Sequence, residues 1–265
     1  MIGNITIGQY FPGQSILHKL DPRTKILSML IFLIALFIVD EITGYGLIFA
    51  FTIVTIILSQ IPPKLLLRGI IPLWWIILFT TGIHFFTTPG QTIWQWGSLN
   101  LTVEGIRMGS FMTLRLVLLI LVSSLLTLTT SPISLTDGIE RLLSPFRALG
   151  VPAHEIAMMM TIALRFIPTL IEETEKIVKA QTARGADFNS GGIMERATNT
   201  IPILVPLFVN AFRRADDLAM AMESRCYKGG LGRTRMWELK MGVGDIIALS
   251  ITCSLIIGAV ILRNL

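Results

Sequence analysis

Five apolar runs constrain the fold of this chain more than any other feature of its sequence. They cover about residues 26–39, 44–61, 69–88, 105–130 and 243–262. A membrane-spanning α-helix needs roughly 20 apolar residues, so the last three runs are long enough, the second is marginal and the first is the shortest. Charged residues make up only 15% of the chain, against roughly 25% in soluble domains. We therefore predict an all-α integral membrane protein with about five transmembrane helices.

The charged residues are concentrated between the fourth and fifth runs. Residues 131–240 hold 14 of the 22 lysines and arginines and 12 of the 17 aspartates and glutamates. This distribution predicts three parts: a membrane domain at 1–130 with four transmembrane helices, a domain of amphipathic helices at 131–242, and a C-terminal transmembrane helix at 243–265.

The basic residues of the loops predict the orientation. Lys19, Arg23 and Lys25 precede the first run, and Lys64 and Arg68 separate the second from the third, whereas loops 40–43 and 89–104 contain no lysine or arginine. On length alone the first run could be re-entrant, but this alternation favours a genuine span and a cytoplasmic N-terminus. The chain is then a multi-pass protein of the cell membrane with its charged block in the cytoplasm.

The charged block is expected to form three helices. A Ser-x-x-Asp pattern at Ser134 predicts the start of a short helix that Gly150 closes. Two long amphipathic helices follow at about 153–184 and 194–225, joined by a turn at 189–192. Their polar faces carry residues such as Glu173 and Arg214, which we expect to be solvated.

Each long helix ends with an arginine between two small residues. The first such triplet is Ala183-Arg184-Gly185 and the second is Ser224-Arg225-Cys226. A small neighbour lets another surface approach the backbone, and a terminal guanidinium offers planar donors to carboxylates or carbonyls. Alternatively, each arginine only complements the negative end of its own helix dipole, worth roughly 0.3–1 kcal/mol. The repetition of the triplet favours a docking role.

Methionines gather near both helices. Met158, Met159 and Met160 are consecutive, and Met220 and Met222 lie just before the second triplet. Unbranched, polarizable methionine is common on surfaces that bind several partners, although it also fills cores. We consider both a docking face and core packing for these five residues.

Arg115 lies deep in the fourth run, where an unpaired charge costs at least ~2.5 kcal/mol. It is either a gating arginine or, as we favour, one held by an interior salt bridge or by backbone carbonyls.

Several chemistries have no support in the sequence. There is no phosphate-binding G-x-x-x-x-G-K-[ST] loop, no H-E-x-x-H and no G-x-S-x-G. The spacing of Cys226 and Cys253 does not match a metal site. The basic residues are not concentrated on one face as in nucleic-acid-binding proteins, so we do not expect nucleic acid as a partner. We expect a non-catalytic protein without metal or cofactor. The alternative, a membrane enzyme, rests on carboxylates such as Glu172-Glu173 and Asp216-Asp217, which on a helix mostly face water.

Further motifs give a resemblance to a known family. Residues 20–25 (Leu-Asp-Pro-Arg-Thr-Lys), 129–132 (Thr-Thr-Ser-Pro), 165–168 (Arg-Phe-Ile-Pro) and the two arginine triplets together resemble the transmembrane T components (EcfT) of energy-coupling factor (ECF) transporters, from about Leu20 to Tyr227. The second family motif is normally Ala-Arg-Gly, so Ser224-Arg225-Cys226 departs from it and lacks the terminating glycine.

The resemblance implies specific partners. Two ABC-type ATPase subunits, of the EcfA and EcfA′ type, would receive Arg184 and Arg225, one each. The two long helices would then be coupling helices. They would transmit ATP-driven motion to a separate substrate-binding S component in the membrane, usually a vitamin binder. The T subunit of a dedicated nickel or cobalt transporter is the alternative within the same class.

Overall fold

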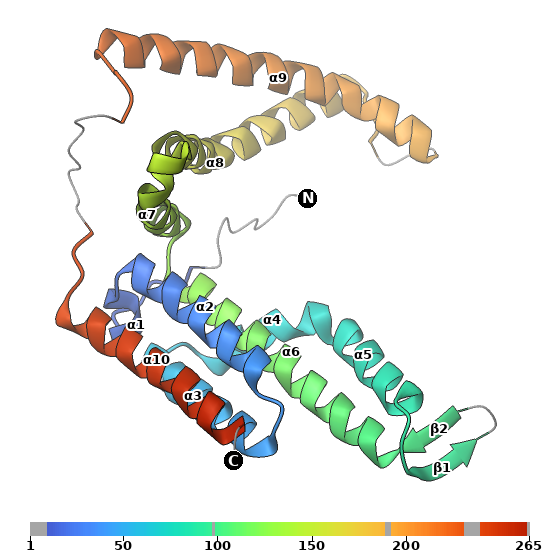
Figure 1. The fold of residues 1–265 in the computed structure, drawn as a ribbon. Coiled ribbons are helices and arrows are strands. Elements are labelled where there is room, and N and C mark those ends of the chain that lie inside the picture. Colours follow the sequence, from blue (N-terminus) through green and yellow to red (C-terminus); the bar gives the residue numbers. More distant parts are fainter. Residues whose placement is uncertain (1–9, 97–98, 189–191, 231–238, 264–265) are drawn as a thin grey trace. The chain divides into compact units, whose positions relative to one another are not determined.

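Helices dominate the parts of the chain that the computed structural model describes, which are residues 10–96, 99–188, 192–230 and 239–263 (Figure 1). The order of elements is α1 (Ile16–Lys19), α2 (Pro22–Ile38), α3 (Ile42–Ser59), α4 (Pro63–Ile70), η1 (Ile71–Leu73), α5 (Trp74–Thr87), β1 (Thr92–Trp96), β2 (Leu99–Thr102), α6 (Val103–Thr129), α7 (Pro132–Leu143), η2 (Ser144–Leu149), α8 (Ala153–Ala183), α9 (Ile193–Ser224) and α10 (Val243–Arg263). The predicted all-α class is confirmed, with one small antiparallel hairpin added between α5 and α6.

Within the described residues, five helical stretches are long and apolar enough to cross a membrane: α3, α4 through α5, α6, α8 and α10. Four of them coincide with predicted spans. The first predicted run lies in α2, which ends at Ile38, before Asp40, and whose 17 residues make it one residue shorter than α3, the shortest of the five stretches. The fifth stretch is instead α8, a helix of 31 residues whose most apolar segment has the lowest mean hydropathy of the five.

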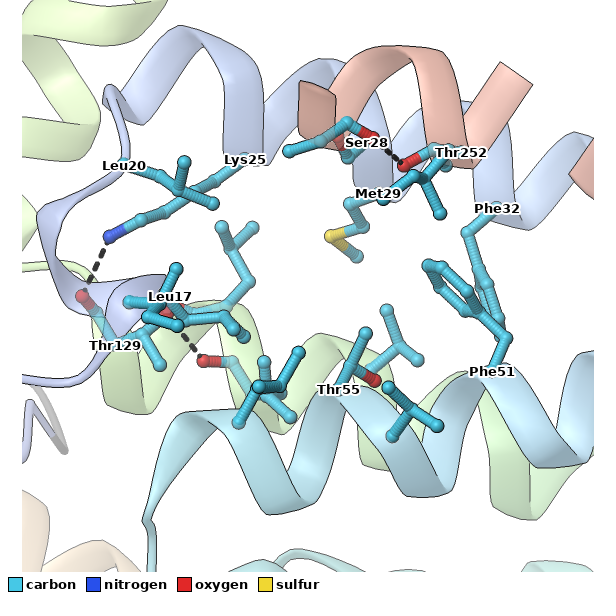
Figure 2. A pocket seen from close by; sticks show the side chains of 18 of the residues that line it. Leu17, Leu20, Lys25, Ser28, Met29, Phe32, Phe51, Thr55, Thr129 and Thr252 are labelled. Carbon is cyan, nitrogen blue, oxygen red and sulfur yellow. Dashed lines mark hydrogen bonds between the residues drawn. The ribbon is translucent and has the colours of Figure 1, made fainter. Parts of the chain in front are cut away.

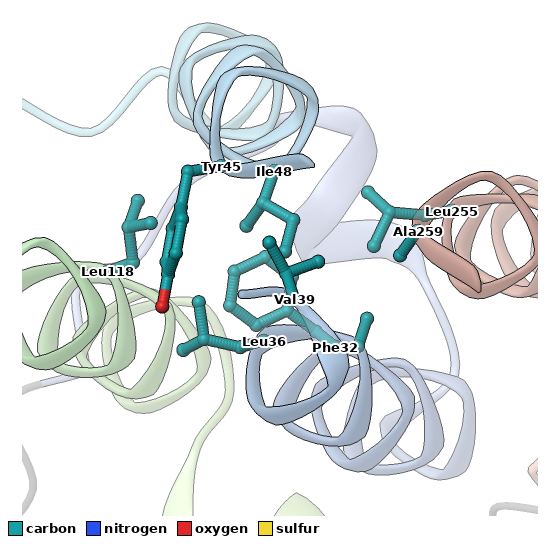
Figure 3. Close-up of a cluster of buried hydrophobic side chains, with 9 residues drawn as sticks. Phe32, Leu36, Val39, Tyr45, Ile48, Leu118, Leu255 and Ala259 are labelled. Atoms are coloured by element: carbon teal, nitrogen blue, oxygen red, sulfur yellow. The ribbon is translucent and has the colours of Figure 1, made fainter. Parts of the chain in front are cut away.

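The helices α2, α3, α6 and α10 share one hydrophobic core (Figure 3). Phe32 and Leu36 of α2, Tyr45 of α3, Leu118 of α6 and Leu255 of α10 are all buried in it. The Tyr45 ring stacks on Phe111 with a centroid separation of 5.1 Å. Helices in lipid associate mainly through such close side-chain packing, since lipid tails are themselves apolar. The short helix α2 is thus an integral part of the membrane bundle.

Arg115 is held within this bundle. Its guanidinium donates to the carbonyl of Val39 at 3.0 Å, lies 3.6 Å from the Asp40 carboxylate and faces the ring of Phe37 at 5.4 Å. The favoured interpretation, a carbonyl clamp with an ion pair, is confirmed. A charge with these partners avoids the full cost of burial in hydrocarbon.

Helix α7 begins three residues earlier than the sequence pattern predicts. The Ser131 hydroxyl accepts from the Ser134 backbone N–H at 3.1 Å, and Pro132 takes the first helical position. Proline there lacks only an N–H that would have no helical partner, so Ser131 and Pro132 together outcompete Ser134 as the helix start. The cap predicted at Ser134 is therefore wrong.

The described residues form two compact units. One comprises residues 10–138 with 239–263 and includes α1–α6 and α10, while the other comprises residues 139–230 and includes α8 and α9. Both predicted arginine triplets belong to the second unit.

Candidate functional site: the arginine tips

Helix α8 ends in a Schellman motif at the first triplet, Ala183-Arg184-Gly185. The Gly185 N–H donates to Thr182 C=O and the Ala186 N–H donates to Gln181 C=O, both at 3.0 Å. Gly185 adopts φ +89°, the left-handed conformation that this motif requires and that glycine adopts without steric cost. Arg184 is the cap residue itself and follows the last helical residue.

Helix α9 ends in the same motif at Ser224-Arg225-Cys226. The Cys226 N–H donates to Glu223 C=O at 2.8 Å and the Tyr227 N–H donates to Met222 C=O at 3.0 Å. Cys226 adopts φ +57° in the position that Gly185 takes in the first copy. For a residue with a Cβ this conformation costs roughly 1–2 kcal/mol. The missing glycine therefore leaves the geometry of the second tip intact, at a cost in backbone energy.

Both guanidiniums of these arginine tips are available to a partner. Arg184 and Arg225 are exposed, and neither guanidinium makes a hydrogen bond or ion pair with the parts of the chain that the structure describes. The last carbonyls of each helix already accept the backbone N–H groups of the Schellman motif. Each arginine thus carries a full charge and unused donors beyond a helix end.

Three contacts show that α8 and α9 run in opposite directions within their unit (Figure 1). The His154 imidazole lies 3.3 Å from the Tyr227 hydroxyl, Asn210 donates to Glu173 at 2.6 Å, and Asn199 donates to the Asp187 carbonyl at 3.1 Å. As the residue number increases from the start of α8 to beyond its end, the number of the contacting residue on the α9 side decreases. The start of each helix therefore lies near the end of the other, and the two arginine tips occupy opposite ends of the pair.

Glu173 does not belong to a solvated face as predicted. Its side chain is 17% exposed, accepts from Asn210 and forms an ion pair with Arg214 at 3.6 Å. The sequence predicted a solvated position because Glu173 belongs to a run of charged residues, of which Glu172 and Lys176 are indeed exposed. The cross-helix contact, 37 residues away in sequence, leaves no periodic signal.

A second polar cluster was not recognised from the sequence. Glu140 of α7 lies 3.1 Å from His154 Nδ1, while His154 Nε2 faces Tyr227, two residues after Arg225. These residues are 14 and 73 positions apart, which matches no ligand or catalytic spacing. Their joint contact links α7, the start of α8 and the end of α9, and so braces the second arginine tip.

The two methionine groups lie at one end of the helix pair. Met159, Met160 and Met220 are exposed, whereas Met158 and Met222 are partly buried. The direction of the helices places both groups at the end that carries Arg225. An apolar stripe at helical spacing continues along α9: Ile201, Leu204, Val205, Phe208 and Phe212. So much exposed apolar surface favours a binding surface.

No group of three or more potential metal-ligating side chains occurs within residues 10–96, 99–188, 192–230 and 239–263. Cys226 and Cys253 are both exposed free thiols.

Five helical stretches among the described residues are long and apolar enough for a membrane, and the chain also has a unit with two exposed arginine tips; this combination defines the class of multi-pass membrane protein. Residues 13–236 match a family model described as CbiQ, cobalt transport protein. This match covers most of the chain and places it among transport proteins.

Similar proteins narrow the class. The chain is 60% identical over 247 residues to the energy-coupling factor transporter transmembrane protein EcfT of Acidaminococcus fermentans, covering 93% of this chain and 92% of that one. It is 59% identical over 259 residues to EcfT of Thermosediminibacter oceani, covering 98% of both, and 47% identical over 263 residues to EcfT of Bacillus subtilis, covering 99% and 98%. The chain belongs to this family of energy-coupling factor transporter transmembrane proteins.

Proposed function

We propose that this subunit couples ATP-driven motion of two ABC-type ATPase subunits to a substrate-binding S component in the membrane. The observation that carries the proposal is the repeated tip geometry. Two helices end in the same Schellman motif, each presents an exposed arginine, and they do so at opposite ends of one antiparallel pair. Two such tips match two similar partners that each have one binding site for a tip.

Each ATPase subunit receives one tip: residues 183–185 dock in one and residues 224–226 in the other. A socket of carboxylates or carbonyl oxygens suits the planar guanidinium. Transmission of motion requires that contacts at the tips differ between the ATP-bound and nucleotide-free states of the ATPases. The subunit itself carries no catalytic step, in keeping with the transport names of its relatives.

The S component, a vitamin or other micronutrient binder, rests on the methionine groups and the exposed apolar stripe of α9. Methionine side chains repack against different shapes, which suits a surface shared among partners. Substrate specificity then resides in the S component.

In the proposed topology, the N-terminus and the unit of residues 139–230 lie in the cytoplasm, α2 is the first span and α8 is a coupling helix. Support for α2 comes from its buried core residues among α3, α6 and α10. Support for α8 comes from its charged second half, including Glu172, Lys176 and Lys179.

Substitution of the tips tests the docking role. The subunit is expressed with its ATPases and S component, and ATPase co-purification is measured for Arg184→Ala, Arg225→Ala and the double variant. Truncating a buried, paired arginine typically costs about 2–5 kcal/mol, so each single variant should retain at most a few per cent of the ATPases under dilute washing. Arg→Lys variants should recover part of the binding, since lysine keeps the charge but loses the planar fork.

Arg213→Ala is the matched control, because Arg213 is an exposed arginine of α9 away from both tips. It should leave co-purification and uptake unchanged. Normal ATPase retention and uptake in the double tip variant would refute the docking role.

A nickel or cobalt transporter of the same architecture is the second candidate, favoured by the description of the matching family model. The identity of the co-purifying membrane component distinguishes the two: a vitamin-binding S component supports the first, and a metal-binding one the second.

A further inference from the structure

An elongated cavity of about 430 Å³ lies among α1, α2, α3, α6 and α10 (Figure 2). Its wall is almost entirely apolar, with residues such as Leu58, Val122, Leu125 and Ile251. The volume falls in the range of small-molecule sites, roughly 300–1,000 Å³, and far exceeds what one water occupies. An apolar cavity of this size in a membrane bundle is suited to an apolar chain.

The cavity lies toward one side of the membrane. It is lined by the last turns of α3 and α6 and by the first turns of α2 and α10. These four helix ends lie on the side where Lys19, Arg23 and Lys25 occur, which is the cytoplasmic side by the bias of basic residues. The cavity therefore lies at the level of the cytoplasmic leaflet.

The two ends of the cavity differ in chemistry. Figure 2 shows Lys25 at one end and the rings of Phe32 and Phe51 at the other. The two rings stack with a centroid separation of 6.0 Å and close the deep end. The Lys25 ammonium donates to Thr129 C=O at 3.0 Å and to His18 C=O at 3.3 Å. An ammonium has three donors, so one remains for a ligand oxygen.

Cations outnumber carboxylates around the Lys25 end. The carboxylates of Asp21 and Asp245 are buried and bound: Asp21 accepts from the Arg23 backbone and pairs with its guanidinium at 3.3 Å, and Asp245 accepts from the backbone N–H of Asp21 at 2.8 Å. Lys19 is exposed and makes no ion pair with the described residues. The outward charge at this end is therefore positive and complements an anionic headgroup.

We propose that this cavity binds one anionic phospholipid of the cytoplasmic leaflet. One acyl chain fills the apolar part as far as Phe32 and Phe51, and a phosphate oxygen accepts from Lys25. The lipid completes the packing between α1, α2, α3, α6 and α10 at their cytoplasmic ends, independently of whether the arginine tips dock to ATPases.

Native mass spectrometry of the full chain, purified with its partners, tests this proposal. The protein is stripped of lipid and exposed to mixed micelles with equal phosphatidylglycerol and phosphatidylcholine. We expect one retained phospholipid per chain, with phosphatidylglycerol favoured at least fivefold. Ala248→Phe fills the cavity from α10 and should lower lipid occupancy at least tenfold. Ser250→Phe, on the exposed side of the same helix, should leave the occupancy unchanged.

Two further variants keep the test decisive. If Ala248→Phe fails to fold, Val54→Phe serves instead. It fills the cavity from α3, and the exposed position of Val54 has room for the larger ring. Lys25→Gln should retain a lipid but lose the preference for phosphatidylglycerol, whereas Lys64→Gln, an exposed lysine away from the cavity, should keep it. Equal lipid occupancy in both filling variants and Ser250→Phe overturns the site. Absence of headgroup preference in the wild type, or retention of detergent alone, overturns the anionic lipid as its occupant.

Discussion

Cys226 and Gly185 solve the same geometric problem at different energetic cost. Both follow an arginine at a helix end, and both have positive φ. Glycine accepts this conformation freely, while cysteine brings its Cβ close to the following carbonyl oxygen. The hydrogen bonds around each residue nevertheless match in pattern, so the contacts of the helix end outweigh the preference of the single residue.

Cys226→Gly should stabilise the second tip. It relieves roughly 1–2 kcal/mol of backbone strain, partly offset by about 0.5–1 kcal/mol because glycine is more flexible in the unfolded chain. Hydrogen exchange of the amides of residues 226 and 227 should slow severalfold. Ser224→Gly, inside the last turn of the helix, should speed the same exchange, since mid-helix glycine costs up to about 1 kcal/mol. Faster exchange in Cys226→Gly would contradict the strain.

At the scale of elements, the long helices were predictable and their mutual contacts were not. Their predicted bounds, 153–184 and 194–225, differ from α8 and α9 by about one residue, because glycine, proline and periodic apolar residues mark helix ends locally. The contacts of His154 with Tyr227 and of Glu173 with Asn210 join residues far apart in sequence. Local patterns carry no information on such pairs, so the candidate site was predicted as two separate tips.

The Glu173–Asn210 contact should hold the crossing of α8 and α9. A double-mutant cycle with Glu173→Ala and Asn210→Ala should give a coupling free energy of about 0.5–3 kcal/mol, as for side chains in direct contact. Thermal unfolding or hydrogen exchange in detergent provides the measurement. The control cycle pairs Asn210→Ala with Glu172→Ala, an exposed neighbour, and should be additive within about 0.5 kcal/mol. Additivity in both cycles would show that the contact contributes nothing.

For the whole molecule, composition sufficed to predict the class, and length alone did not identify the spans. The apolar runs correctly indicated four of the five stretches that can cross a membrane. The disagreement concerns α2, which the sequence predicts as a span, and α8, which meets the length criterion instead. Helix α2 is short and packed in the bundle core, while α8 is long and moderately apolar. A length criterion counts residues and ignores which helices pack together, so it admits α8 with 31 residues and passes over α2 with 17, although α2 is the more apolar helix.

Cysteine labelling distinguishes the two topologies. In a Cys226→Ser, Cys253→Ser background, Gln91→Cys and Thr182→Cys each introduce one thiol at an exposed position. If α8 is a coupling helix, only α6 crosses between them, and a membrane-impermeant maleimide should label Gln91→Cys in intact cells and Thr182→Cys only after permeabilisation. If α8 crosses as well, both thiols would react from the same side, which would refute the proposed topology.

The antiparallel pairing of α8 and α9 makes them a single strut fastened near both ends and at its middle, about 46 Å long by the rise of α8. Forces applied in the same direction at Arg184 and Arg225 translate such a strut, whereas opposed forces exert a torque. Partners bound at the two ends therefore shift the helix pair when they move in the same direction, and rotate it when they move in opposite directions.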